Sequence, residues 1–236
     1  MTAWLVSQLS PQAPGLWLLV SLLALLVLLL LWPTLSWRAR RYGLYARWLI
    51  APYLGLLSGG LSPRLMGLSH FDWLVSLSLG LAISFAIVGV LLVVRATTLV
   101  IQPLEQTPSL VSTPRGGGRL PIAPYLRQAF ACGVEEFHWS FLRAATWEML
   151  LSLPNPPAYP LYTAVWIGAI MAAVELMVVR HGGSRRLLKL VVIVASTLLF
   201  FYTRNFWLCW ALHTATWMIL QPVESSSLTK EQGVVS

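Results

Sequence analysis

One apolar run, at residues 15–32, constrains the fold of this chain more than any other feature of the sequence. It consists mainly of leucine and valine, and a helix needs about 20 such residues to cross the hydrocarbon core of a bilayer. No basic segment precedes the run and no small-residue cleavage site follows it. We therefore expect a retained membrane span rather than a signal peptide. Further apolar runs occupy residues 42–60, 72–94, 158–179, 187–203 and 205–221.

The overall composition excludes a water-facing globule. Of the 236 residues, 57% are hydrophobic and only 10% are charged, whereas soluble domains carry about 25% charged residues. The net charge of +8 comes largely from arginine clusters between the apolar runs, which is typical of membrane loops and not of a nucleic-acid-binding face. We therefore expect an all-α, polytopic transmembrane helical bundle whose partner is the lipid bilayer, with no nucleic acid.

The number of spans depends on residues 42–60, because this apolar run contains Arg47 and Pro52. If the run crosses the membrane, the chain has about seven spans. If it lies at the interface, with Arg47 reaching toward water, the chain has six. Seven spans place nearly all basic clusters on one side and only Arg64 and Arg204 on the other. By the positive-inside rule, this arrangement predicts an N-terminus outside and a C-terminus in the cytoplasm.

The chain divides into four parts. Residues 1–101 are predicted to form N-terminal transmembrane helices, and residues 125–221 a helical core. Between them, residues 102–124 carry five prolines and three consecutive glycines, which predicts an exposed loop. Residues 222–236 form a polar tail. The ionisable residues of the helical core are the candidates for chemistry.

Ionisable side chains gather on a predicted helix at residues 125–153, which carries Glu135, Glu136, His138 and Arg143. A charged side chain at membrane depth costs about 2.5–3.5 kcal/mol, so such residues pair with one another, face a wet cavity or bind a ligand. Residues three, four or seven apart share a helix face. Glu135 and His138 therefore lie on one stripe, and Glu136 and Arg143 lie on the neighbouring one.

Two further ionisable residues lie in other apolar runs. Glu175 stands in residues 158–179 and offers Arg143 an alternative partner to Glu136. A single histidine in an apolar helix, such as His213, is more often packed than catalytic, but a buried diacid elsewhere favours function.

Two adjacent carboxylates do not readily ionise together, so one can act as a base while the other holds a proton or pairs with arginine. Such a set, with an imidazole, is suited to activating water for peptide hydrolysis. Glu–Arg pairs that only lock helices together are the structural alternative.

The segment EEFHWSFLR, residues 135–143, resembles the Glu-Glu-x-x-x-Arg motif of the CPBP family, which contains CAAX prenyl endopeptidases, bacteriocin-processing enzymes and their bacterial relatives. Residues 205–217 resemble the approach to the family's late His-x-x-x-Asn/Asp motif, and the resemblance covers residues 125–221. It implies a multi-span intramembrane endopeptidase that cleaves a membrane-associated peptide or protein near the membrane surface. It implicates Glu135 as the residue that activates water, with Glu136 and Arg143 supporting Glu135. It implicates His138 and His213 as residues that bind a divalent metal such as zinc or stabilise the oxyanion. Glu175 and Asn205 are further candidates.

Three departures from the family pattern motivate a second hypothesis. Arg143 stands seven residues after Glu136 instead of four, residues 158–179 lack the family's middle histidine, and Trp217 replaces the late Asn or Asp. The alternative is a catalytically degenerate CPBP-fold protein that acts as an assembly factor or accessory subunit of a membrane complex. A composition rich in leucine and tryptophan and poor in lysine suits a bacterial inner membrane or a cyanobacterial thylakoid, so a photosynthetic complex is included.

A proton- or ion-coupled transporter is the third hypothesis, since intramembrane carboxylates also serve proton relays. The sequence shows no inverted repeat and no pair of helices broken by glycine or proline, features that many such transporters use. The first two hypotheses are therefore preferred.

Overall fold

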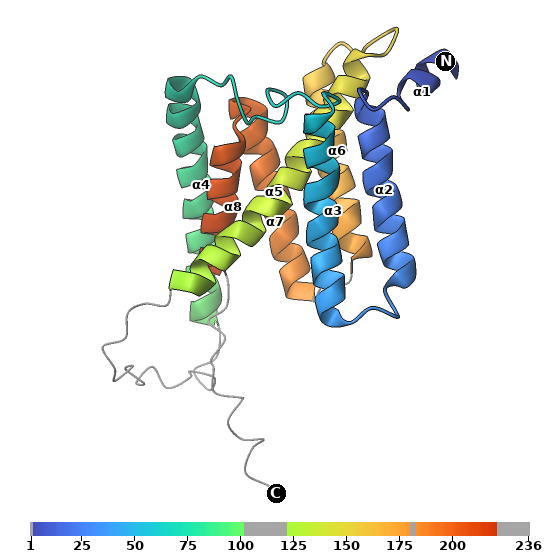
Figure 1. Ribbon diagram of the computed structural model, residues 1–236. Coiled ribbons are helices and arrows are strands. Elements are labelled where there is room, and N and C mark those ends of the chain that lie inside the picture. The colour runs from blue at the N-terminus through green and yellow to red at the C-terminus, as the bar shows by residue number, and fades with distance from the viewer. Residues whose placement is uncertain (1, 102–121, 180–182, 221–236) are drawn as a thin grey trace, which may run out of the picture.

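The computed structural model describes residues 2–101, 122–179 and 183–220, and every regular element in these ranges is an α-helix (Figure 1). The predicted all-α fold is therefore confirmed for this part of the chain. Most of the predicted loop at residues 102–124 and the whole predicted tail at residues 222–236 lie outside the described residues. The helices are α1 (Thr2–Ser7), α2 (Pro14–Leu31), α3 (Trp37–Leu57), α4 (Trp73–Ile101), α5 (Ile122–Leu151), α6 (Pro160–Val178), α7 (Gly183–Thr203) and α8 (Phe206–Leu220).

Four helices of the described chain are long and apolar enough to cross a membrane. They comprise Pro14–Leu31 in α2, Trp73–Val93 in α4, Pro160–Val178 in α6 and Arg186–Thr203 in α7. Much of the surface of these helices is exposed leucine, valine and isoleucine, which suits contact with lipid rather than water. Charged residues interrupt α3 and α5, and α8 has only 15 residues, which corresponds to about 22 Å of helix. Length and composition alone therefore identify four spans, not seven.

Helix α5 is the central element of the bundle. It runs at a steep angle to the other helices and crosses the middle of the molecule (Figure 1). It packs against α2, α3, α6 and α8, while α7 contacts α4, α6 and α8. Because α5 passes between these neighbours, the ionisable residues in its middle face helices from both halves of the chain.

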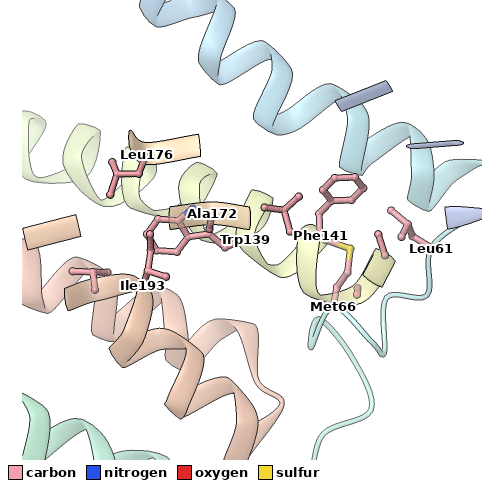
Figure 2. Close-up of a cluster of buried hydrophobic side chains, with 11 residues drawn as sticks. Leu61, Met66, Trp139, Phe141, Ala172, Leu176 and Ile193 are labelled. Carbon is pink, nitrogen blue, oxygen red and sulfur yellow. The ribbon is translucent and has the colours of Figure 1, made fainter. Parts of the chain in front are cut away.

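Apolar side chains surround the middle of α5 and fix its position. Figure 2 shows Trp139 and Phe141 of α5 packed with Ala172 of α6, and with residues of α7 and of the connection between α3 and α4. Gly168 brings α6 close to α5, because a Cβ atom added there would lie 3.0 Å from the Cα atom of Arg143. This close approach lets the two backbones pack with little space between them.

A short break separates α7 from α8, where the sequence predicts one. Arg204 adopts a positive φ of 49°, which ends α7. The Oδ1 atom of Asn205 then accepts hydrogen bonds from the backbone N–H groups of Trp207 and Leu208, at 2.9 and 3.3 Å. This is a side-chain cap on the first turn of α8. The N–H of Phe206 also donates to the carbonyl oxygen of Gly67, at 2.9 Å, so the break meets the α3–α4 connection.

Candidate active site

Glu135 of α5 stands at the wall of a large cavity, and Lys189 and His213 from other helices lie beside it. Its Oε1 atom lies 2.5 Å from the Nζ atom of Lys189 in α7. Its Oε2 atom lies 3.6 Å from the Nε2 atom of His213 in α8. The cavity has a volume of about 910 Å³, and all three of these residues line it. Glu135 is thus the carboxylate of the diacid that a ligand in the cavity can reach.

Glu136 is fully buried and is paired with Arg143 on the same helix. The guanidinium of Arg143 also donates to the carbonyl oxygens of Trp139, at 3.2 Å, and of Ser196, at 3.3 Å. It lies over the ring of Phe200 at 4.4 Å from the centroid, a favourable cation–π distance. Of the two partners that the sequence allows Arg143, the structure selects Glu136. The second carboxylate is therefore held in place by a cation that is itself immobilised.

His213 lies between the two carboxylates. Its Nε2 atom faces Glu135 and its Nδ1 atom faces Glu136, each at 3.6 Å. Its ring stacks on Trp139, with ring centroids 4.9 Å apart and planes 4° apart. A distance of 3.6 Å is longer than a hydrogen bond, so stacking on Trp139 holds the imidazole in this position. With the Glu136–Arg143 pair, the structure thus brings together four of the predicted site residues: Glu135, Glu136, Arg143 and His213.

His138 belongs to a second buried cluster, with Glu175 of α6 and Arg47 of α3. Its Nε2 atom lies 2.9 Å from the Oε2 atom of Glu175, and Arg47 donates to the other carboxylate oxygen. Arg47 also donates through Nε to the carbonyl oxygen of Ser21 in α2, at 2.9 Å. This arginine is buried, with 5% of its surface exposed, and its guanidinium is directed to groups of α2 and α6 inside the bundle. The cluster ties four helices together.

Residues of both clusters line one small cavity. It has a volume of about 20 Å³, and its lining includes Arg47 and Glu175 of one cluster and Glu135 and Lys189 of the other. A volume of about 10–15 Å³ is enough for one water molecule, given two to four polar partners. The charged groups around it supply those partners, so a single water can connect the clusters.

Asn205 and Trp217, which belong to the late motif, lie at different places in the structure. Asn205 caps α8 and stands eight residues before His213, which is about 12 Å along a helix. Its described contacts are with the α8 backbone and not with the carboxylates. Trp217 is buried and lines the cavity one turn after His213. A tryptophan at this position supplies an apolar wall where the family pattern has a polar amide or acid.

The predicted metal ligands do not form one donor set. His138 and His213 belong to separate clusters, and no group of three or more His, Cys, Asp or Glu side chains suited to a metal ion occurs among the described residues. Lys189 and Arg143 already neutralise Glu135 and Glu136. A divalent cation at the diacid would have to displace them, so the residues present do not fit a zinc site.

Arg47 and Lys189 are the site residues that the sequence analysis did not single out. An arginine inside an apolar run, such as Arg47, indicates a site residue, because an ionisable residue at membrane depth has a partner or a function by default. Lys189 gives a weaker signal, since it ends a run of basic residues from Arg180 and resembles a loop charge.

Comparison with protein-family models, with curated proteins and with solved structures gives no match for this chain. A carboxylate faces a cavity, an ammonium and an imidazole lie beside it, and a second carboxylate is fixed behind it. This set contains a base, a proton carrier and a donor for a developing negative charge.

Proposed function

We propose that the protein is an intramembrane endopeptidase in which Glu135 activates water. The observation that carries this proposal is the position of Glu135, whose carboxylate lines a cavity of about 910 Å³ beside Lys189 and His213. A pocket of this size accepts a short peptide segment. The resemblance of residues 135–143 and 205–217 to CPBP motifs supports the same chemistry.

The proposed reaction uses the protein's own groups. Glu135 accepts a proton from water, and the water oxygen forms a bond to the carbonyl carbon of the substrate. The resulting oxyanion is stabilised by the ammonium of Lys189, which moves from the carboxylate to the developing charge. The C–N bond then breaks, and the proton on Glu135 passes to the leaving nitrogen. His213 orients the water, because its imidazole lies 3.6 Å from the Glu135 carboxylate.

In the proposed membrane arrangement, α3, α5 and α8 cross the bilayer together with the four apolar helices. Their charged residues are acceptable there because Arg47, Glu136 and Arg143 are paired inside the bundle, away from lipid. Seven spans put the N-terminus outside and the C-terminus in the cytoplasm. We place the protein in a bacterial inner membrane or a thylakoid, with the cavity open near the cytoplasmic surface.

The test compares Glu135→Gln with Glu148→Gln, the same change on the same helix. Glu148 accepts a hydrogen bond from the backbone N–H of Ser62 at 2.7 Å, which a glutamine oxygen can still accept, and it does not line the cavity. Each variant is reconstituted in liposomes with solubilised membrane proteins, and new N-termini are identified by mass spectrometry. We expect cleavage by the wild type and by Glu148→Gln, and a loss of at least about 100-fold in Glu135→Gln. Equal cleavage by all three proteins would contradict the proposal.

A second candidate is an accessory subunit or assembly factor with the fold of a protease. One observation favours it: Glu135, Glu136 and Glu175 are each paired with a cation, which satisfies their charges without any substrate. Co-purification of a stoichiometric partner, unchanged in Glu135→Gln, together with no cleavage by the wild type, is the result expected of this function.

A further inference from the structure

Two arginines stand at the end of the large cavity that is formed by the connection between α2 and α3. The guanidinium of Arg40 lies 5.3 Å from the ring centroid of Trp32. That of Arg41 lies 5.7 Å from the ring of Trp37 and 5.5 Å from the ring of Tyr45. All five residues line the cavity. Aromatic faces therefore hold both cations in position at the cavity wall.

Neither cation is paired with a carboxylate of the described residues. Among residues 2–101, 122–179 and 183–220, no carboxylate forms an ion pair with Arg40 or Arg41. Both side chains are half-buried, and the Nε atom of Arg40 donates to the carbonyl oxygen of Leu35 at 2.9 Å. Two fixed guanidinium groups that the described residues leave without a counter-charge are complementary to an anion with several oxygens, such as a phosphate.

The rest of the cavity wall is apolar at the same end. Leu29, Leu44, Val178 and Val179 line it. The apolar run of α2 ends at Leu31, so the arginines that follow lie at the level where hydrocarbon gives way to head groups. An occupant that satisfies both walls carries a phosphate and a hydrocarbon chain.

We propose that this cavity is a binding site for an acidic phospholipid, with its phosphate on Arg40 and Arg41 and an acyl chain against the apolar wall. The volume of about 910 Å³ accepts a head group and part of one chain. A lipid in this cavity occupies space that the proposed function gives to the peptide substrate, so the two occupants compete. Lipid retention and peptide cleavage are measured in separate experiments, and either can fail alone.

Native mass spectrometry of the full chain tests the site, with phosphatidylglycerol and phosphatidylcholine offered as equal competitors. We expect the wild type to retain one phosphatidylglycerol molecule and to prefer it over phosphatidylcholine by about 30-fold. The Arg40→Gln/Arg41→Gln variant should lose this preference. The matched control is Arg38→Gln/Arg127→Gln, which removes two exposed charges outside the cavity and should keep the preference. Arg40→Lys/Arg41→Lys keeps both charges and should retain most of the preference for phosphatidylglycerol. This variant therefore distinguishes an effect of lost charge from an effect of misfolding.

Three results would overturn the inference. Equal loss of preference in the two glutamine double variants would show that diffuse surface charge attracts the lipid. Persistence of the preference in Arg40→Gln/Arg41→Gln would place the lipid elsewhere. Displacement of phosphatidylglycerol by equimolar glycerol phosphate or an acidic peptide would show that the site recognises a soluble anion or a peptide and not a lipid.

Discussion

Glu136 and Arg143 form an ion pair that is closed off from both water and the cavity. Glu136 is 0% exposed and Arg143 is 2% exposed, and the arginine is also bound by backbone carbonyl oxygens of α5 and α7. A charge in such a place is tolerated only while its partner remains. The pair therefore separates Glu136 from solvent, and Glu135 is the carboxylate of the two that lines the cavity.

The pair predicts a specific pattern of stability changes. Arg143→Met leaves Glu136 without its cation, and we expect a loss of about 3–5 kcal/mol in the free energy of unfolding. Glu136→Gln/Arg143→Met removes both charges and should be more stable than the single arginine variant. The free energy is measured by denaturant unfolding in detergent micelles. Arg127→Met, which changes an exposed arginine on the same helix, is the control and should have little effect.

An additive result would contradict this account. If the double variant is destabilised by the sum of the two single changes, the residues do not interact, and Glu136 is held by other groups such as His213, whose Nδ1 atom lies 3.6 Å away.

At the residue level, ion pairs within one helix were predictable from the sequence, and ion pairs between helices were not. The Glu136–Arg143 pair follows from a separation of two helical turns, so the sequence restricted Arg143 to two partners. The Arg47–Glu175–His138 cluster joins α3, α5 and α6, and it depends on how far each helix is rotated and shifted against its neighbours. Spacing along one chain segment does not contain that information.

At the scale of helices, the contact of α5 with α6 depends on Gly168. A Cβ atom at this position would lie 2.8 Å from Cγ and 3.0 Å from Cα and N of Arg143. The nearest atoms include backbone atoms, which cannot move aside by a change of rotamer. Any larger residue must therefore push α6 away from the helix that carries the site.

We expect Gly168→Ala to lower the free energy of unfolding by about 1–3 kcal/mol, as for other overpacked cores. Gly89→Ala is the matched control, because Gly89 lies within α4 and a Cβ atom there meets nothing within 4 Å. That control should be neutral or slightly stabilising, since alanine favours the helix over glycine. Unfolding is again followed in detergent, and equal effects of the two changes would mean that α5 and α6 do not pack closely at Gly168.

Helix positions were largely predictable from hydropathy and from breaking residues. The predicted helix at residues 125–153 corresponds to α5, Ile122–Leu151, and the predicted break near Arg204 separates α7 from α8. The steep angle of α5 (Figure 1) was not predictable. It arises from packing against four helices at once, and these contacts exist only in the folded bundle.

For the whole molecule, two groups of arginines lie at opposite ends of the bundle. The α2–α3 connection lies at one end and the α3–α4 connection at the other (Figure 1). Arg38, Arg40 and Arg41 lie at the start of α3. Arg64 lies in the α3–α4 connection, which meets the α7–α8 break at the Gly67–Phe206 hydrogen bond. Arg64 and Arg204 therefore share an end of the molecule, as the seven-span prediction requires.

The same separation predicts which residues can be labelled from outside a cell. If α3 crosses the membrane, a cysteine at position 64 and a cysteine at position 38 face opposite sides. Both arginines are exposed, and the native Cys132 and Cys209 are buried, so the unmodified chain provides a low background. In intact bacterial cells, we expect a membrane-impermeant maleimide to label Arg64→Cys, and to label Arg38→Cys only after permeabilisation.

The labelling pattern distinguishes the possible arrangements because each one places the two cysteines differently. Labelling of both variants in intact cells, or of neither, would show that α3 does not cross and would favour six spans. Labelling of Arg38→Cys alone would show that the chain has the opposite orientation in the membrane. The large cavity, which Arg40 and Arg41 line, would then open outside the cell. In that case a peptide or lipid would reach Glu135 from the opposite membrane surface, and the proposed cytoplasmic access to the site would be wrong.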